Sequence, residues 1–339
     1  MKLYNNDGDF PLSVAVWLAN NEYDFTPKPT ELSVTDLLKS TRQLVLRQRR
    51  LEQEVLNPVA IKPINLSSLV AAKFGNAIHN GIETSWVNNV QESLKDLGYP
   101  QGLINNVMVN PTEEELLAYP NAVPVYMEIR NTKQIDGYTI SGKFDFIADG
   151  VLEDFKSTST YSWVKGVNDA KYVMQGSLYR WLNPDIVTQD YMMITFIFTD
   201  WSKAQSFGST DYPSQRIMSK TFTMKSMPET EQWVRHKLLE VKAGMGKPEA
   251  ELPLCNKEEL WQDAPKFKYY KNPAKVGGRS TKNFDSELEA NERLGKDGYV
   301  GVVIVQPAKA KACAYCNEYE ACTQKDQLII DGLLDEKVT

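Results

Sequence analysis

The stretch YTISGKFDFIADGVLEDFKS, residues 138–157, decides the fold that we expect for this chain. Two strand-like runs, 138–149 and 151–157, meet at the dipeptide Asp149-Gly150, which is a strong signal for a tight hairpin turn. Closing the hairpin there brings Asp145 and Asp154 near each other on paired strands. Alternation along the second strand places Lys156 on the same face as Asp154. The stretch therefore predicts a hairpin that carries two carboxylates and a lysine.

This combination of side chains has a chemical use. Two carboxylates that lie close together repel each other unless a divalent cation sits between them, and their oxygens suit Mg²⁺ or Mn²⁺. A lysine beside them can orient a water molecule or stabilise charge on a phosphate. A surface hairpin with cross-strand charge pairs would use the same residue types. The stretch alone leaves both interpretations open.

The flanking sequence predicts the rest of an α/β (α+β) core. Apolar periodicity and capping signals predict strands at 123–129, 191–201 and 216–224, and helices at 31–56, 66–98, 168–183 and 228–244. Helices and strands in this order favour a central mixed sheet flanked by helices. From residue 246 the sequence becomes loop-rich and contains cysteines. We expect an N-terminal helical segment at 1–60, a core at 61–245 and a cysteine-liganded region at 246–339.

Composition narrows the class of protein. The chain has 339 residues, is 42% hydrophobic and 24% charged, and carries 38 Lys plus Arg against 44 Asp plus Glu, as expected of a soluble globular protein. A net charge of −6 means that any nucleic-acid binding must come from local basic patches. No run approaches the roughly 18 apolar residues that would span a membrane. The start MKLYNNDGDFPL has no apolar segment of an export signal, so we expect a cytoplasmic protein, in a bacterial cell or an infected host cell.

Four motifs follow one another in a specific order. They are FGNAIHNGIE at 74–83, which contains His79, GKFD at 142–145, DFK at 154–156 and QGSLY at 175–179. This order resembles the RecB-like branch of the PD-(D/E)xK nuclease superfamily, which carries a helix histidine, G-x-x-D, D-x-K and Q-x-x-x-Y. The resemblance implies a restriction-endonuclease-like core and phosphodiester hydrolysis.

The resemblance also implies a role for each matching residue. Asp145 and Asp154 would be carboxylate metal ligands, with His79 as an added ligand and the Phe155 carbonyl completing the shell. Lys156 would be the catalytic lysine. Gln175 and Tyr179, at i and i+4 on one helix face, would position DNA or the strands of the active site.

Two neighbouring carboxylates leave alternatives to this assignment. Glu153 precedes Asp154 and could be recruited in its place, although alternation with Lys156 favours Asp154. Glu128, on the preceding strand, is a further candidate for binding the metal or positioning water.

The four cysteines predict a second metal centre. Cys313, Cys316 and Cys322 are spaced C-x-x-C-x5-C, and Cys255 lies apart. In a reducing compartment such spacing indicates metal binding, either structural Zn²⁺ or an iron–sulfur cluster, and spacing alone does not decide. AddB-type and CRISPR-associated RecB-like nucleases end in the same spacing and hold a 4Fe-4S cluster, which favours the cluster here. Their fourth cysteine precedes the core, whereas Cys255 follows it.

Between these cysteines lies a basic segment, KFKYYKNPAKVGGRSTK at 266–282, without an acidic residue. Aromatic residues alternate with the charges, a mixture typical of DNA contacts through phosphates and base stacking, although a solvated loop is equally compatible. The candidate DNA-binding residues are Lys266, Lys268, Tyr270, Lys271, Lys275, Arg279 and Lys282. A second basic run, Arg47, Arg49 and Arg50, could contact phosphate or form a solvated helix face.

These observations predict a Mg²⁺- or Mn²⁺-dependent deoxyribonuclease. We expect an exonuclease that acts on single-stranded DNA or duplex ends in phage or bacterial recombination, repair or replication, with proteins of those processes as partners. A structure-selective endonuclease on the same core is the alternative enzyme. A catalytically idle DNA-binding scaffold subunit is the alternative from a different class, and the intact Asp145, Asp154 and Lys156 argue against it.

Overall fold

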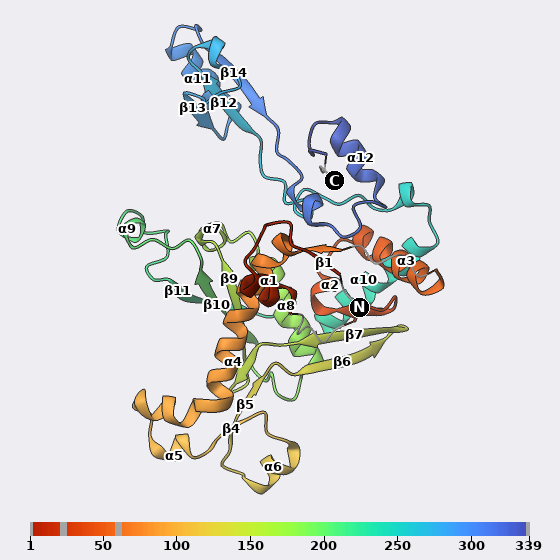
Figure 1. Ribbon diagram of the computed structural model, residues 1–339, viewed down its shortest axis with the longest axis vertical. Coiled ribbons are helices and arrows are strands. Elements are labelled where there is room, and N and C mark those ends of the chain that lie inside the picture. Colours follow the sequence, from red (N-terminus) through yellow and green to blue (C-terminus); the bar gives the residue numbers. More distant parts are fainter. Residues whose placement is uncertain (1–2, 21–25, 58–62, 337–339) are drawn as a thin grey trace. The chain divides into compact units, whose positions relative to one another are not determined.

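The computed structural model describes residues 3–20, 26–57 and 63–336 (Figure 1). The chain forms two compact units. Unit 1 comprises Met1–Leu38 and Leu51–Leu238, and unit 2 comprises Lys39–Arg50 and Leu239–Thr339. The sequence pattern groups residues 39–50 with an N-terminal segment at 1–60, whereas the fold groups them with the cysteine-containing part of the chain. Within the described residues, no helix is both long enough and apolar enough to cross a bilayer.

Unit 1 is built on a six-stranded mixed sheet of order β11-β10-β9-β8-β5-β4. Its strands are β4 (Val107–Val109), β5 (Val123–Met127), β8 (Phe146–Ala148), β9 (Val151–Thr158), β10 (Tyr191–Phe198) and β11 (Ile217–Thr223). The pairs β4–β5 and β9–β10 are parallel and the other neighbours antiparallel. The predicted central mixed sheet is confirmed.

The hairpin predicted at Asp149-Gly150 is present between β8 and β9. Both turn residues have positive φ, 50° and 72°, the left-handed conformation that a two-residue turn needs. Phe146 pairs with Glu153 across the hairpin. The next step in this register sets Asp145 opposite Asp154.

The run predicted as one strand at 138–149 is divided between two sheets. Its first half, β7 (Tyr138–Lys143), belongs to a three-stranded sheet with β2 (Glu31–Ser33) and β6 (Arg130–Ile135), and its second half is β8. The chain also crosses between the sheets from β5 to β6. Met127 pairs with Phe146 and Arg130 with Lys143, so the two crossings lie side by side. The sequence does not predict β6 because residues 130–135 are mostly polar.

Two helices pack against β9 and its neighbours. Helix α4 (Val70–Asp96) contributes Ile82 and Trp86 to an apolar cluster with residues of β5, β8 and β9. Helix α8 (Asp169–Leu182) lies on β7 and β10. A Cβ at Gly142 would approach within 2.7 Å of Leu182, and one at Gly176 within 2.0 Å of Met192. A side chain at either position would require the neighbouring side chains to move, so glycine allows α8 to pack this closely.

The predicted helix at 31–56 is wrong in its first half. Residues 31–33 form β2, and a separate short helix, α2 (Val34–Leu37), is closed by a capping box between Ser33 and Asp36. Helix α3 (Thr41–Leu56) begins only after Ser40. The remaining elements of unit 1 are β1 (Tyr4–Asn5), α1 (Leu12–Ala19), β3 (Ile64–Asn65), α5 (Gln101–Ile104), α6 (Glu113–Ala118), α7 (Thr160–Lys165) and α9 (Lys203–Ser206).

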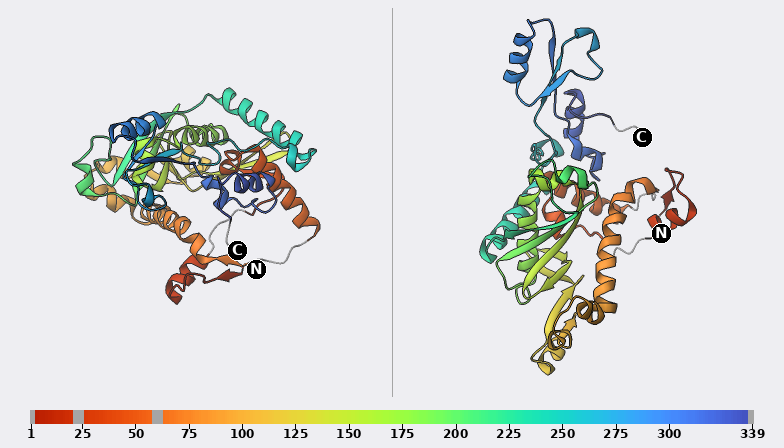
Figure 2. Two further views of the ribbon diagram at one scale, coloured as in Figure 1. Left: turned by 90° about the horizontal axis from the view of Figure 1, so that it is seen from above. Right: turned by 90° about the vertical axis from the view of Figure 1, so that its left-hand side faces the viewer.

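Unit 2 contains a small antiparallel sheet of order β13-β12-β14, covered by α11 (Glu287–Lys296) (Figure 2). The strands are β12 (Lys266–Tyr270), β13 (Lys282–Phe284) and β14 (Val302–Gln306). The basic segment is thus strand at both ends, and the loop-rich texture expected from 246 onward applies to the residues outside this sheet. Helix α12 (Thr323–Ile330) and short 3-10 turns also belong to unit 2, whereas helix α10 (Met227–Met245) is divided between the units after Leu238.

Candidate functional site

The crossings between the two sheets of unit 1 bring three ligand-type side chains together. Atoms of His79, Glu128 and Asp145 lie within 4.8 Å of one another. The Nδ1 atom of His79 is 3.5 Å from Asp145 Oδ1 and 3.7 Å from Glu128 Oε1. Its Nε2 atom is 3.2 Å from the Phe155 carbonyl oxygen. Two carboxylates and the Nδ1 atom of the imidazole form a donor set that could hold Mn²⁺ or Mg²⁺. The Phe155 carbonyl, predicted to complete the shell, lies at the other ring nitrogen, where it contacts Nε2.

The backbone at this site is held in an unusual conformation. Glu128 has φ of 52°, in the left-handed region that a residue with a Cβ seldom occupies. Its amide donates to the Asp145 carbonyl across the two crossings at 3.2 Å. The Asp145 carboxylate in turn accepts from the Phe155 amide at 2.8 Å. Local strain of this kind is found at functional sites, and here the strained residue is the one whose carboxylate lies 3.7 Å from His79 Nδ1.

Asp154 lies outside this group of three side chains and forms an ion pair with Lys156. The Lys156 Nζ lies 2.5 Å from Asp154 Oδ2, and Asp154 is only 1% exposed. The other oxygen of Asp154 accepts from Gln175 Nε2 at 2.9 Å, and Gln175 also lies 3.4 Å from the Tyr179 hydroxyl. Gln175 and Tyr179 are both buried. They therefore hold the β9 carboxylate from α8.

Burial and neighbouring charges act in opposite directions on the pKa values of the site. Burial alone would lower the pKa of His79, but Asp145 and Glu128 raise it to about 10. Burial raises the pKa of Asp154 to about 6 against the opposing charge of Lys156. Burial disfavours the Lys156 ammonium, yet the two aspartates keep its pKa above the ordinary lysine value. Without a metal ion, His79 is therefore protonated at neutral pH and supplies the positive charge between two carboxylates.

Two further residues complete the surroundings. Glu153 points away from the site and accepts a hydrogen bond from Thr195 on β10, so the structure brings Asp154 and not Glu153 to Lys156. Lys143, the second residue of GKFD, lies 2.5 Å from Glu128 Oε2. Lys143 is not among the residues predicted from the sequence, although the motif places this second cation two positions before Asp145.

The four cysteines of unit 2 line one small cavity of about 30 Å³. Cys255 is tied to the other three through α12. Its amide donates to Gln324 Oε1, and its carbonyl accepts from Gln324 Nε2, both at 2.9 Å. The fold thus brings the distant cysteine to the C-x-x-C-x5-C segment. Thiolates are donors that suit Zn²⁺ or an iron–sulfur cluster.

The arginine side chains of α3 make contacts within the protein that the sequence did not predict. Arg47 is 5% exposed, Arg49 donates to the carbonyls of Gly244 and Lys247, and Arg50 pairs with Glu318 at 2.9 Å. These contacts lie within unit 2. The run is therefore not simply a solvated face, because Arg47 is buried and the guanidinium groups of Arg49 and Arg50 are engaged within unit 2.

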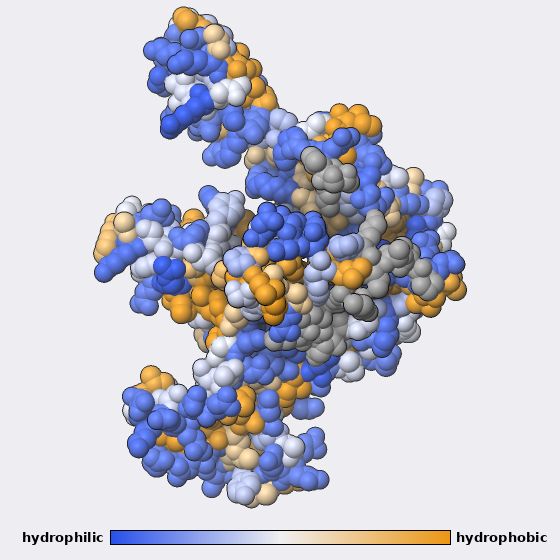
Figure 3. All heavy atoms as spheres, in the orientation of Figure 1, coloured by the Kyte–Doolittle hydropathy of each residue, from blue (hydrophilic) through white to orange (hydrophobic). Residues whose placement is uncertain are grey.

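The basic segment presents charges but few aromatic faces. Lys271, Lys275, Arg279 and Lys282 are exposed, and Figure 3 shows mostly hydrophilic side chains over this sheet and α11. Lys268 is half-buried in β12, and Lys266 pairs with Asp285. The Tyr270 ring is 4% exposed and its hydroxyl donates to the Gly278 carbonyl. Tyr270 therefore offers no face for a base to stack on, which corrects that prediction.

Comparisons with known proteins give little further information. No family model and no curated protein sequence matches the chain. Solved structures with partial similarity include SSO0001, with a TM-score of 0.38 and 16% identity over 67% of this chain and 84% of the other. A candidate exonuclease from Eubacterium rectale gives 0.33 and 15%, over 65% and 84% of the chains. A phage-related exonuclease from Haemophilus somnus gives 0.24 and 12%, over 61% and 92%. TM-scores this low do not establish a shared fold, so the proposals below rest on the sites themselves.

Proposed function

We propose that unit 1 is a divalent-metal-dependent deoxyribonuclease that hydrolyses phosphodiester bonds as an exonuclease. The observation that carries this proposal is the convergence of His79, Glu128 and Asp145 within 4.8 Å, beside the ion pair of the buried Asp154 with Lys156. The order of the four sequence motifs supports the same reaction. A surface hairpin with ordinary charge pairs would not bury its aspartate to 1% exposure.

The side chains divide the work between holding a cation and handling the phosphate. His79, Glu128 and Asp145 would hold Mg²⁺ or Mn²⁺, which would polarise the phosphate and lower the pKa of a coordinated water. Lys156 stabilises negative charge that develops on the phosphate as water oxygen attacks phosphorus and the P–O bond to the leaving oxygen breaks. Asp154 fixes the ammonium of Lys156, and Gln175 fixes Asp154.

Lys143 adds a second positioning contact. It binds Glu128 through Oε2 and leaves Oε1 directed at His79. A lysine in this place keeps the strained glutamate oriented toward the metal position. It also lowers the repulsion between Glu128 and Asp145 before a cation binds.

DNA is the proposed substrate, and the exposed lysines and arginine of the basic segment in unit 2 are its proposed phosphate contacts. Because Tyr270 is buried, this surface would act through charge, with little dependence on base sequence. Proteins of recombination, repair or replication remain the proposed partners.

The test is digestion of end-labelled linear DNA and of closed circular DNA in Mg²⁺, Mn²⁺ or excess chelator. We expect metal-dependent release of nucleotides from the labelled end and an intact circle. Cutting of the circle would identify an endonuclease instead. Absence of cleavage of either DNA in both metals would overturn the nuclease assignment and leave a DNA-binding scaffold.

We further propose that the four cysteines of unit 2 hold one structural metal centre, a 4Fe-4S cluster in preference to Zn²⁺. Four ligands around one cavity would leave no open position for catalysis. The test is metal and sulfide analysis of anaerobically purified protein, with an absorbance shoulder near roughly 400 nm expected for a cluster. Colourless protein with stoichiometric zinc would replace the cluster with zinc, and protein without either metal would refute the centre.

A further inference from the structure

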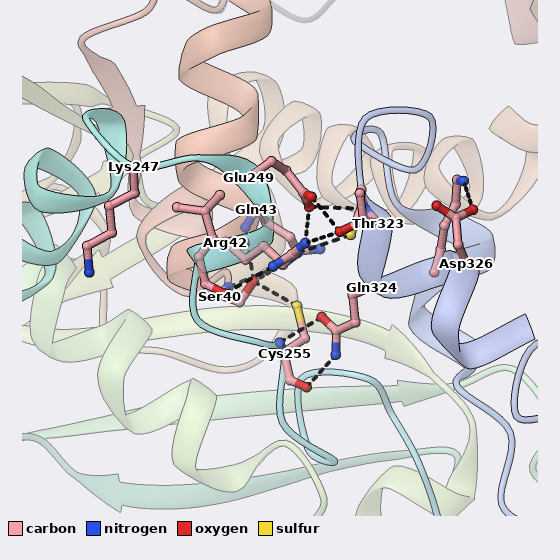
Figure 4. A network of polar contacts seen from close by, with 12 residues as sticks. Ser40, Arg42, Gln43, Lys247, Glu249, Cys255, Thr323, Gln324 and Asp326 are labelled. Carbon is pink, nitrogen blue, oxygen red and sulfur yellow. Dashed lines mark hydrogen bonds and ion pairs between the residues drawn. The ribbon is translucent and has the colours of Figure 1, made fainter. Parts of the chain in front are cut away.

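The first turn of α3 lies against the cysteine cavity of unit 2 (Figure 4). Ser40 Oγ is 3.2 Å from Cys255 Sγ, Arg42 Nε is 3.2 Å from Cys322 Sγ, and Gln43 Nε2 is 3.6 Å from Cys316 Sγ. Three residues from one helix turn thus contact three of the four sulfurs. No sequence motif assigns them to the centre.

Local chemistry fixes two of these three side chains. Ser40 and Gln43 form a capping box. The backbone N–H of Gln43 donates to Ser40 Oγ at 3.1 Å, and the side-chain Oε1 of Gln43 accepts from the backbone N–H of Ser40 at 3.2 Å. With Oε1 engaged, the Nε2 of Gln43 is the end that faces Cys316. The helix N-terminus that this box closes also favours negative charge.

Arg42 is a buried arginine that contacts a cysteine sulfur. Its side chain is 1% exposed, and its remaining nitrogens donate to the Leu252 carbonyl at 3.1 Å, to Thr323 Oγ1 at 3.3 Å and to Glu249. Arginine has donors only, so the Cys322 sulfur must be the acceptor in their contact. A thiolate accepts such a bond far better than a thiol, and four thiolates around a metal centre leave a net negative charge that burial makes costly.

We infer that Ser40, Arg42 and Gln43 are positioning residues of the cysteine centre. Arg42 and Gln43 donate hydrogen bonds to its sulfurs, and Ser40 contacts Cys255 and caps the helix that carries the two donors. Arg42 supplies the buried cation, and Glu249 with the Leu252 carbonyl orients its guanidinium. The inference rests on the proposed metal centre but does not depend on whether that centre is zinc or iron–sulfur. It makes residues 40–43, more than 200 positions before Cys255 in the chain, part of the ligand environment.

The test compares Arg42→Gln with Arg49→Gln in the full-length, metal-loaded protein. Arg49 lies on the same helix and donates to backbone carbonyls of unit 2 without contacting a sulfur. The first measurement is the metal content of each variant, and the second is release of the metal to a chelator at equilibrium. Hydrogen bonds to metal ligands typically contribute roughly tenfold to a hundredfold in affinity. We expect a loss of that size in Arg42→Gln and an affinity within about twofold of wild type in Arg49→Gln, which lacks such a bond.

Gln43→Met provides a variant that keeps the buried arginine if Arg42→Gln fails to fold. It removes one N–H donor from Cys316, and we expect a smaller loss in the same direction. In an iron–sulfur protein both variants should also shift the reduction potential to more negative values. Equal metal affinity and potential in wild type, Arg42→Gln and Gln43→Met would overturn the inference. Wild-type protein that binds no metal would instead refute the centre itself.

Discussion

The acidic site of unit 1 and the cysteine site of unit 2 solve the same electrostatic problem with different means. Each gathers groups that repel one another when charged. In unit 1 these are carboxylates, balanced by Lys143, Lys156 and a protonated His79. In unit 2 they are sulfurs, with Arg42 donating to Cys322.

The difference lies in what holds the balancing charges. Lys143 and Lys156 of unit 1 remain partly exposed, at 35% and 26% of their side chains, and each forms an ion pair with a carboxylate. Arg42 is enclosed, and each of its donor nitrogens has a partner. A site whose charges can still reach solvent suits a reaction with an incoming phosphate. A site whose charges are fully engaged suits a fixed structural centre.

The largest effect that separates the two sites is expected from Lys156→Gln. Loss of an electrostatic stabiliser of this kind costs about 10²–10³ in rate, and loss of the lysine that also neutralises Asp154 should reach at least the upper value. Cleavage of labelled DNA measures it. The matched control is Glu153→Gln on the same strand, whose side chain faces Thr195. Near-normal cleavage by Lys156→Gln would exclude Lys156 from the chemistry.

Stability could confound this comparison, and a double variant separates the two effects. Removing Lys156 alone leaves a buried carboxylate unpaired, at a cost of about 3–5 kcal/mol. Asp154→Asn combined with Lys156→Gln removes both charges, so thermal unfolding should return toward that of wild type while cleavage stays absent. The metal content of the cysteine centre serves as an internal reference and should not change in any of these variants.

The next effect is a pH dependence that the acidic site should show. Below about pH 10 the metal-free His79 carries a proton, and a metal ion that uses this imidazole must displace it. Mn²⁺ affinity should therefore rise by roughly tenfold per pH unit between pH 7 and 9. Below about pH 6, protonation of Asp154 removes a further negative charge, so the affinity should fall more steeply.

Titration of Mn²⁺ by electron paramagnetic resonance at several pH values measures this slope. His79→Gln is the control, because it removes the displaced proton and should flatten the dependence. A wild-type affinity that does not change between pH 7 and 9 would show that His79 is not a ligand.

A smaller effect is expected from the basic segment. The triple variant of Lys271, Lys275 and Arg279 to alanine should weaken duplex binding and reduce the salt slope by about 0.9 for each phosphate that the variant no longer neutralises. Tyr270→Phe is the control, since it keeps the buried ring and removes only the hydroxyl bond to Gly278. DNA affinity measured against salt concentration distinguishes them. A triple variant with an unchanged slope would place the phosphate-binding surface elsewhere.

How far the sequence predicts these sites depends on how local each one is. The hairpin with Asp145, Asp154 and Lys156 follows from one turn and from alternation, which are properties of 20 neighbouring residues. The positive φ of Glu128 does not, because it arises where two strands cross between two sheets. The approach of His79 likewise requires the packing of α4, and only the motif resemblance pointed to it.

The cysteine centre shows the same limit more sharply. Cysteine spacing predicts which residues would be ligands, but the donors around them come from a helix start that the prediction from sequence merged into a longer helix. Ser40 and Gln43 carry a capping-box signature that could have located that start. Nothing in the sequence indicates that Arg42 would contact Cys322, because this contact depends on tertiary packing alone. The prediction that aromatic residues of the basic segment stack on bases is wrong for a local reason. Alternation of aromatic residues with lysines is also the pattern of a strand with one buried face, and the pattern alone does not distinguish the two.

The smallest effect concerns the support that α8 gives to Asp154. Tyr179→Phe removes the contact of 3.4 Å to Gln175 but leaves the bond of 2.9 Å from Gln175 to Asp154. A single hydrogen bond contributes about 1 kcal/mol, so we expect a loss in cleavage rate of roughly fivefold. Gln175→Leu should cost more, because it leaves a buried carboxylate oxygen without its donor. If instead Tyr179→Phe were the more damaging variant, the tyrosine hydroxyl would have to contact DNA directly, and the role of this helix would change from positioning the carboxylate to binding substrate.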